Sequence, residues 1–271
     1  MSIDASSEAA PAEVRLGSIL VSLLDPEKGR EVEFHRWYER DHFYSGCMVG
    51  SHFFAGRRFV ATRSLKDERL PERDSLFEDV RDGSYLALYW LLAGHHAEAE
   101  RWAVDRVQSL HANDRMMPGR HAVHAGFYHW RFTVERDPDG VPVELALDHP
   151  YDGLGMTFLV APTEAARADL LEALEARLLP ESLAQSEASL CLALTPTLLP
   201  DDAPSYVERP EGLDRRVLLL SFFSGAPQGV MRSWTEGLVK GLEAEGLARL
   251  EFAAPFIPTI PGSDRYADEL W

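Results

Sequence analysis

The feature that most constrains the fold of this sequence is an order of secondary-structure elements that occurs twice. Alternating or β-branched apolar runs predict strands, and apolar residues spaced by three and four positions predict helices. The first half reads strand, helix, strand, strand, helix and strand, at residues 15–24, 30–45, 51–62, 84–92, 95–110 and 121–134. The second half has the same order, at residues 156–160, 164–179, 188–195, 216–223, 228–245 and 248–256.

Each half is therefore predicted to form a βαββαβ module, which is the ferredoxin-like plan. One such module covers only one face of its sheet with helices, and the other face is apolar. Two modules in one chain can bury these faces against each other. The predicted fold class is α+β, with two ferredoxin-like modules packed as a pseudo-dimeric α/β barrel. The alternative is two unrelated α+β domains that share an element order by accident.

The predicted domain boundaries follow this repeat. We expect a disordered tail at residues 1–14, a first module at 15–149, a second module at 150–261 and a docking tail at 262–271. The docking tail ends in Tyr266, Leu270 and Trp271, so we expect it to be buried on the body or on a second subunit.

Two segments outside the repeated elements also carry predictions. The charged insertion at residues 63–83 is predicted to be a surface loop with a short helix, because it is too polar for a core. A turn at residues 137–140 (Asp-Pro-Asp-Gly) predicts a hairpin that returns through a strand at residues 141–147.

Composition excludes several classes of protein. The chain of 271 residues carries 44 acidic and 27 basic side chains, which argues against nucleic acid or an anionic membrane as a partner. It has only two cysteines, Cys47 and Cys191, which form no disulfide framework and fit a reducing, cytoplasmic compartment. Its longest apolar runs are too short to span a membrane.

The two halves differ in their chemistry. All ten histidines lie within the first 149 residues, and histidine is the usual group for proton transfer near neutral pH. On a helix, Phe34, Tyr38 and His42 would form one stripe with Trp37 beside it. Burial of this stripe would leave His42 as a neutral base next to a phenol. The alternatives are that the stripe only packs and that the halves diverged by drift.

The pattern Phe34-x-x-Trp37-Tyr38-x-x-x-His42, followed by a strand that ends Gly56-Arg57-Arg58-Phe59, resembles the dimeric α/β-barrel superfamily, especially its EthD-like branch. The resemblance covers residues 34–59, and the element order agrees over the whole chain, here as a tandem duplication. It implies an α/β barrel. The superfamily includes cofactor-free monooxygenases, lactone isomerases, polyketide cyclases, and haem enzymes such as chlorite dismutase and dye-decolorizing peroxidases.

The resemblance departs from the family in two ways. Family members often have a proline soon after the motif histidine, whereas here residues 43–45 (Phe-Tyr-Ser) follow. The second half lacks the motif altogether.

These observations lead to a first functional hypothesis. The protein is predicted to be a small-molecule enzyme that acts on a hydrophobic, aromatic or polyketide-like substrate by acid/base chemistry without a bound cofactor, such as a cyclase, an isomerase or a cofactor-free monooxygenase. We assign His42 as general base and Tyr38 as proton donor or orienting group. The predicted substrate-binding residues are Phe34, Trp37, Arg58 and Trp90.

Some assignments stay open at this stage. Arg57 and Arg58 point to opposite faces of their strand, so one of them is expected to hold an anionic or carbonyl group of the ligand. No metal site is predicted, because no HExxH motif occurs and because His121 and His129 share one strand face while His124 takes the other, which leaves no metal triad. We expect a homodimer.

The alternative functions are a non-catalytic ligand-binding or scaffold protein of the same fold and, with less support, a haem protein. In the haem branches of the superfamily the ligand histidine lies in the C-terminal module, and this C-terminal module has none.

Overall fold

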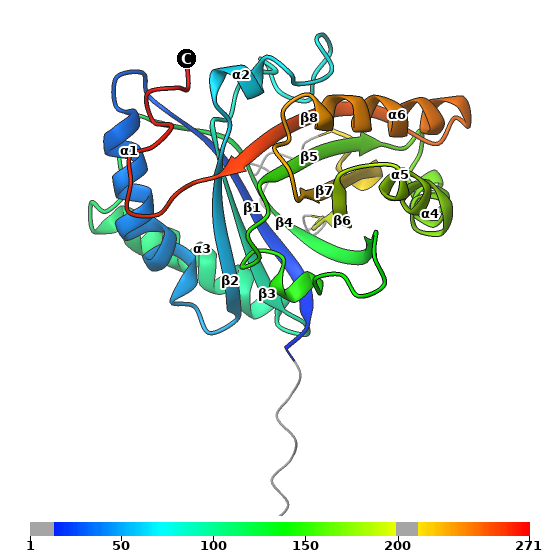
Figure 1. Cartoon of the computed structure of the whole chain (residues 1–271). Coiled ribbons are helices and arrows are strands. Elements are labelled where there is room, and N and C mark those ends of the chain that lie inside the picture. Colours follow the sequence, from blue (N-terminus) through cyan, green and yellow to red (C-terminus); the bar gives the residue numbers. More distant parts are fainter. Residues whose placement is uncertain (1–13, 199–210) are drawn as a thin grey trace, which may run out of the picture.

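In the computed structural model, which describes residues 14–198 and 211–271, eight strands close into one antiparallel barrel (Figure 1). Their order around the barrel is β1-β3-β2-β8-β5-β7-β6-β4. The strands are β1 Leu16–Pro26, β2 Phe53–Val60, β3 Tyr85–Leu92, β4 Arg120–Glu135, β5 Gly153–Val160, β6 Ala188–Pro196, β7 Arg216–Phe223 and β8 Arg249–Pro258. Because the sheet closes on itself, it leaves no unpaired edge.

The strand order confirms the predicted fold class. The first four strands lie in the order β4-β1-β3-β2, and the last four lie in the equivalent order β8-β5-β7-β6. The two sheets meet twice, where Phe59 of β2 faces Pro258 of β8 and where His129 of β4 faces Thr195 of β6. In both seams the second strand of one sheet pairs with the fourth strand of the other. The chain is thus α+β, with two ferredoxin-like modules in a pseudo-dimeric α/β barrel.

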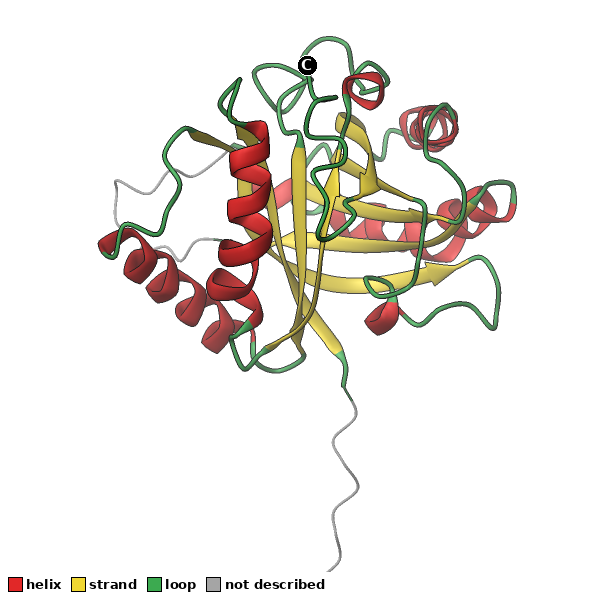
Figure 2. Cartoon of the chain, turned by 60° about the vertical axis from the view of Figure 1, so that its left-hand side comes forward, coloured by secondary structure: helices red, strands yellow, loops and turns green. Residues whose placement is uncertain are grey.

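The helices cover the outer faces of the two sheets (Figure 2). On the first sheet lie α3 His96–Ala112 and a long helix made of α1 Glu31–Trp37 and the π-helical segments η1 Tyr38–His42 and η2 Tyr44–Met48. On the second lie α4 Ala166–Ala173, η4 Leu174–Leu178, α5 Leu179–Ala184 and α6 Val230–Ala244. The remaining short elements are α2 Arg63–Lys66, η3 Val143–Leu145 and η5 Leu213–Arg215.

Alternation along each strand separates three apolar cores, one inside the barrel and one under each helical layer. On β3, Leu86, Leu88 and Trp90 face the barrel interior, whereas Tyr85 and Tyr89 face α1 and α3. Polar groups under the first helical layer are therefore separated from the barrel interior by the sheet.

The insertion between β2 and β3 closes one end of the barrel. Leu70 exchanges two backbone hydrogen bonds of 3.0 and 2.7 Å with Ala253 of β8, and the ring of Phe77 lies 4.8 Å from that of Phe252. The buried Arg69 donates to three backbone carbonyls of the same segment, those of Val80, Asp82 and Gly83. The predicted short helix is present as α2, but the expectation that the segment is too polar to enter the core is wrong, because Leu65 and Phe77 pack on the barrel core and three carbonyls of the segment accept hydrogen bonds from Arg69.

The segment after β4 closes the other end. The strand predicted at residues 141–147 is wrong, because this segment contains the 3-10 turn η3 and packs Val143 and Leu147 into the barrel core. A hairpin strand would need a free edge of β4, but β4 already pairs with β1 on one side and with β6 on the other.

The C-terminal segment, residues 262–271, lies on α1 and α2 (Figure 1). The backbone amide of Arg63 donates to the carbonyl of Glu269 at 2.7 Å, and Leu270 is buried. Tyr266 is half-buried and Trp271 is 40% exposed, so the three residues expected to be buried are covered unequally.

Two further expectations concern the rest of the chain. Apart from Val14, the predicted tail 1–14 falls outside the described residues. Within residues 14–198 and 211–271, no helix is long and apolar enough to cross a membrane.

Candidate functional site

The first helical layer encloses a charged side chain. Arg58 of β2 is 6% exposed, and its guanidinium lies over the rings of Tyr38 at 4.8 Å and Tyr85 at 5.4 Å. Its neighbour Arg57 points to the opposite face and donates to the carbonyl of Leu147 at 3.1 Å. Because side chains alternate along β2, only one of the two arginines lies under the helical layer. It is Arg58, the residue that was predicted from the sequence to bind the ligand.

His35 connects this arginine to the C-terminal segment. Its Nδ1 accepts a long hydrogen bond of 3.4 Å from Arg58, and its Nε2 donates to the carbonyl of Ser263 at 2.8 Å. This arrangement requires the neutral Nε2–H tautomer. Burial, together with the charge of Arg58, holds the pKa of His35 below its ordinary value. His35 was not among the predicted site residues, because it lies one position away from the apolar stripe.

Three tyrosines surround the same guanidinium. The hydroxyls of Tyr38 and Tyr89 lie 3.2 Å apart, whereas the buried hydroxyl of Tyr85 has no hydrogen-bond partner among the described residues. Burial raises the pKa of Tyr38 to about 12 and the pKa values of Tyr85 and Tyr89 above their ordinary range. We call Arg58, His35 and these three tyrosines the tyrosine–arginine cluster. The spacing Tyr85-x-x-x-Tyr89 on one strand face was the sequence signal for two of its members.

His42 and Trp37 lie at the edge of this cluster. The ring of His42 stacks on Trp37 with centroids 4.6 Å apart and contacts Tyr38 edge-on at 5.1 Å, and no hydrogen bond joins His42 to Tyr38. Burial, assisted by the charge of Arg120, lowers the pKa of His42 to about 4. A base with this pKa is neutral at pH 7 but weak compared with a general base poised near neutrality.

The helix above the cluster is π-helical where it crosses β2. Phe34, which is fully buried, contacts Tyr38 with ring centroids 5.8 Å apart. At Gly56 of β2, an added Cβ would lie 2.6 Å from the sulfur of Met48 and 2.9 Å from the ring of Phe43. Glycine at this position therefore lets η2 lie directly on the strand. Single π-helical turns inside α-helices occur frequently at functional sites.

Trp90 does not belong to this group. It faces the barrel interior, and its indole N–H donates to the carbonyl of Val143 at 2.9 Å. The structure therefore brings together five of the six predicted site residues and places Trp90 on the other side of the sheet. The physical reason is alternation, since Trp90 directly follows Tyr89.

Unsatisfied polar atoms concentrate in this region. Of the eight buried side-chain polar atoms without a hydrogen-bond partner among the described residues, four lie in or beneath this helix, namely Glu39 Oε2, His42 Nδ1, Ser45 Oγ and Tyr85 OH. Buried polar groups are nearly always paired in folded proteins. Their concentration indicates a place suited to a polar partner from outside the chain.

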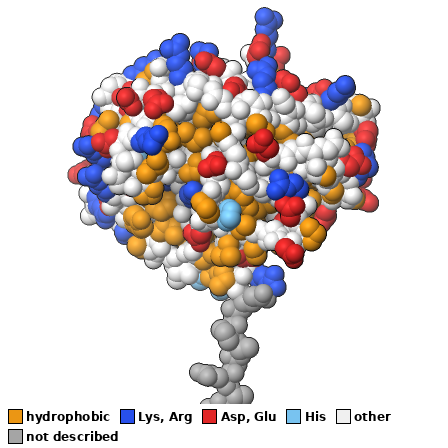
Figure 3. All heavy atoms as spheres, viewed as in Figure 1, with side chains coloured by type: hydrophobic (Ala, Val, Ile, Leu, Met, Phe, Trp, Pro, Cys, Tyr) orange, Lys and Arg blue, Asp and Glu red, His pale blue; other side chains and the backbone are white. Residues whose placement is uncertain are grey.

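Four pockets lie elsewhere on the described residues. Their volumes are about 860 Å³ between α5 and α6, 470 Å³ between α2 and the C-terminal segment, 470 Å³ between β4 and α4, and 660 Å³ beside the β2–β8 seam. Hydrophobic side chains gather in the middle of the face drawn in Figure 3. None of the six predicted site residues lines these four pockets, because η1 and η2 enclose the cluster.

No model of a known protein family matches the sequence, and no curated protein matches it. Solved structures do match. An anthrone oxidase-like protein is 10% identical with a TM-score of 0.53, the match covering 92% of this chain and 95% of that one. A chlorite dismutase-like protein is 11% identical with a TM-score of 0.53, covering 95% and 100%. A dye-decolorizing peroxidase from Bacteroides thetaiotaomicron is 8% identical with a TM-score of 0.52, covering 95% and 97%.

These neighbours correct the main functional hypothesis. The superfamily resemblance identifies chlorite dismutases and dye-decolorizing peroxidases as haem enzymes, and both kinds of protein are among the structures with this fold. The prediction of a cofactor-free acid/base enzyme is therefore wrong, because the structures that share this fold include kinds of protein that use haem.

Haem does not fit at His42 in the candidate site or at His121, the histidine that lines one of the four pockets. The ring of His42 lies against Gly46, where an added Cβ would be 3.4 Å from Nδ1, so an iron-bound macrocycle has no space there. His121 lines the pocket near α2, whose walls are mostly charged rather than apolar. The residues after 149 contain no histidine. At these identities the comparisons establish the fold alone, and that fold is the ferredoxin-like dimeric α/β barrel.

Proposed function

We propose that the protein binds a small molecule through an anionic oxygen at Arg58, within the first module. The observation that carries this proposal is that Arg58 is buried without a carboxylate within 4 Å among the described residues, Glu39 acting on it only from a longer distance. A buried charge without a carboxylate in direct contact is costly, so an anionic ligand in contact with Arg58 would offset a cost that the folded chain bears.

The surroundings of Arg58 suggest the chemical class of the ligand. Phe34, Trp37 and Tyr38 present aromatic rings, and the unpaired hydroxyl of Tyr85 can donate to a ligand oxygen. An aromatic carboxylate or a phenolate suits such a site, because a flat ring stacks on the aromatic side chains while its oxygen faces the guanidinium. Entry requires η1 and η2 to move away from β2.

The predicted catalytic roles of Tyr38 and His42 stay predictions. Within this proposal both residues act first as walls of the binding site. His42 is neutral at pH 7 and therefore accepts or donates a hydrogen bond without repelling Arg58.

We also propose that the chain belongs to the EthD-like branch and is a tandem duplication, with modules at residues 15–149 and 150–261. The equivalent strand orders of the two sheets support the duplication, and the Phe34 to His42 motif supports the branch. A homodimer stays a prediction, which the molar mass of the protein in solution tests. A closed barrel within one chain does not itself require a second copy.

The binding proposal is tested with benzoate, salicylate and 4-hydroxybenzoate as probes, by calorimetry and by quenching of tryptophan fluorescence. We expect the wild type to bind at least one probe and Arg58→Met to weaken that binding at least about tenfold. Arg57→Met is the matched control, because it removes a neighbouring arginine on the opposite sheet face. Equal affinities of Arg58→Met and the wild type, or no binding of any probe to the wild type, would contradict the proposal.

A further inference from the structure

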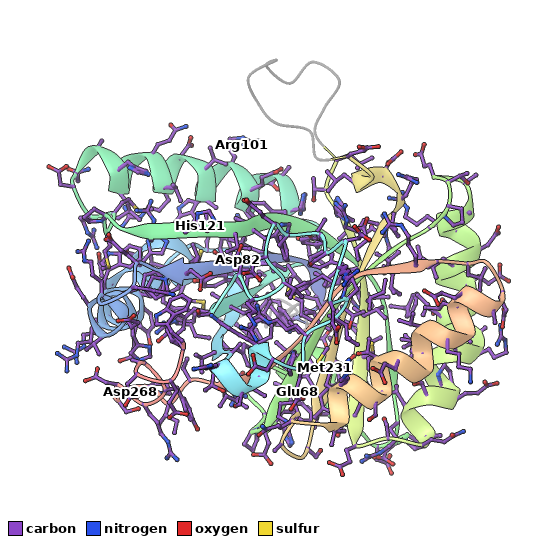
Figure 4. The ribbon with its side chains drawn as sticks, turned by 90° about the horizontal axis from the view of Figure 1, so that it is seen from above. Glu68, Asp82, Arg101, His121, Met231 and Asp268 are labelled. Atoms are coloured by element: carbon purple, nitrogen blue, oxygen red, sulfur yellow. The ribbon has the colours of Figure 1, made fainter. Side chains whose placement is uncertain are left out.

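A second group of reactive side chains lies at the barrel end that the insertion closes. A pocket of about 470 Å³ opens there between α2, the insertion and the C-terminal segment. Figure 4 looks onto this end and labels two of the lining residues, Asp82 and His121, which come from the insertion and from β4. The pocket shares no lining residue with the tyrosine–arginine cluster, so its chemistry is independent of the proposed function.

Lys66 is the most deeply buried amine of this pocket. Its side chain is 3% exposed. Its Nζ donates a hydrogen bond to Ser84 Oγ at 2.6 Å and lies 3.8 Å from Asp25 Oδ1. The indole ring of Trp271 covers the amine, with its centroid 4.2 Å from Nζ. Burial lowers the pKa of Lys66 to about 8, although the carboxylate of Asp25 opposes the shift.

Lysine is rare in this sequence. The 27 basic side chains include only three lysines, Lys28, Lys66 and Lys240, and the other two are exposed. Arginine stays charged at all ordinary pH values, whereas an amine can lose its proton and become a nucleophile. A purely structural cation at position 66 would not need this property.

We propose that Lys66 is a nucleophilic amine that forms an imine with a small carbonyl compound bound in this pocket. The neutral amine attacks the carbonyl carbon to give a carbinolamine, which loses one water to leave a carbon–nitrogen double bond. Hydrolysis reverses the reaction, so no oxidant or reductant is required.

The hydrogen bonds around Lys66 provide a path for the proton that it must lose. Lys66 donates to Ser84 Oγ, and this hydroxyl donates in turn to Asp25. Asp82 lines the same pocket, and burial together with the charge of Asp25 raises the pKa of its carboxyl. As a lining residue, Asp82 can hydrogen-bond to the hydroxyl that leaves as water.

The charges around the pocket indicate the substrate class. Lys28 and Arg63 line the pocket without a carboxylate within 4 Å among the described residues, whereas Arg81 is paired with Asp67. Asp79 and Asp82 also line the pocket without an ion pair to any residue that the structure describes, so Lys28 and Arg63 are the two groups that can hold a carboxylate or a phosphate of a carbonyl compound, such as an α-keto acid or a phosphorylated aldehyde. Trp271, which lies between Lys28 and Lys66, must move for this compound to reach the amine.

Trapping of the imine tests the proposal. The full-length protein is incubated at pH 7.5 with glyoxylate and cyanoborohydride, or with pyridoxal 5′-phosphate followed by borohydride, and the labelled lysines are identified by peptide mass spectrometry. A pKa of about 8 leaves roughly a quarter of Lys66 neutral, against roughly 0.1% for an amine with the ordinary value of 10.5. We therefore expect Lys66 to be labelled at least about tenfold faster than Lys240.

The variants separate a reactive amine from a structural one. Lys66→Arg keeps the charge and should abolish this label, Lys240→Arg is the matched control, and Trp271→Ala should accelerate labelling severalfold. The proposal is overturned when the folded protein is labelled only at Lys28 and Lys240 and Lys66 reacts only after denaturation. This comparison uses the wild type, so it decides the question even when Lys66→Arg fails to fold.

Discussion

Replacing Arg58 by methionine should stabilise the protein. The two hydrogen bonds from Arg58 to His35 are both 3.4 Å long, so their loss costs little. Loss of the contacts with the rings of Tyr38 and Tyr85 costs about 1–3 kcal/mol together. Removal of a buried charge that has no carboxylate in direct contact, only Glu39 at a longer distance, stabilises the folded state by more than this, on the order of 3–5 kcal/mol. The net effect is an increase of about 2 kcal/mol in the free energy of unfolding, within a range of about 0–4 kcal/mol.

Arg57 provides a matched comparison with the opposite expected sign. Its half-buried guanidinium donates to backbone carbonyls at the closed end of the barrel, including that of Leu147. Arg57→Met leaves these acceptors without a donor and should destabilise the protein by about 1–3 kcal/mol. Urea denaturation of both variants at pH 7 measures the two changes. At this chain length each kcal/mol corresponds to roughly 2–4 °C in melting temperature.

A clear result would refute this reasoning. Destabilisation by Arg58→Met of more than about 1 kcal/mol would mean that the aromatic contacts and His35 outweigh the cost of charge burial. Arg58 would then be a structural residue, and the main support for an anionic ligand at this site would be lost.

Four further changes have defined outcomes. Folding lowers the pKa of His42 from 6.5 to about 4, so the contribution of His42 to the free energy of unfolding is complete above pH 6.5 and decreases as the pH falls towards 4. His42→Phe should therefore flatten the pH dependence of urea unfolding between pH 4 and 6.5, and an unchanged slope would show that His42 does not titrate there. Gly56→Ala should cost about 1–3 kcal/mol by pushing η2 off β2, and an unchanged melting temperature would contradict this. Trp90→Phe should cost a similar amount through the lost hydrogen bond yet leave binding of the aromatic acids intact, as calorimetry would show. Deletion of residues 262–271 should lower the melting temperature by several degrees through exposure of Leu270, and an equally stable truncated protein would count against this.

The motif around His42 predicted the fold better than it predicted the chemistry. In this structure Phe34, Trp37 and Tyr38 pack a helix on the first sheet, and such packing is compatible with many different reactions. Comparison with solved structures therefore supported the barrel while removing the support for cofactor-free catalysis.

The sequence by itself determined the elements and their repeated order. Strand and helix periodicities are local properties, so the two βαββαβ patterns could be read directly, and with them the pairing of two modules. Alternation along β3 also contained the information that Trp90 and Tyr89 face opposite sides, although the site prediction did not use it.

Only the tertiary structure decided which distant segments meet. The insertion closes one end of the barrel, where three of its backbone carbonyls accept hydrogen bonds from the buried Arg69. The segment after β4 could not add a strand, because both edges of β4 are paired with other strands. The contact of His35 with Ser263 and the cover of Lys66 by Trp271 join residues more than 200 positions apart. Such contacts depend on closure of the whole barrel, which no local pattern of residues records.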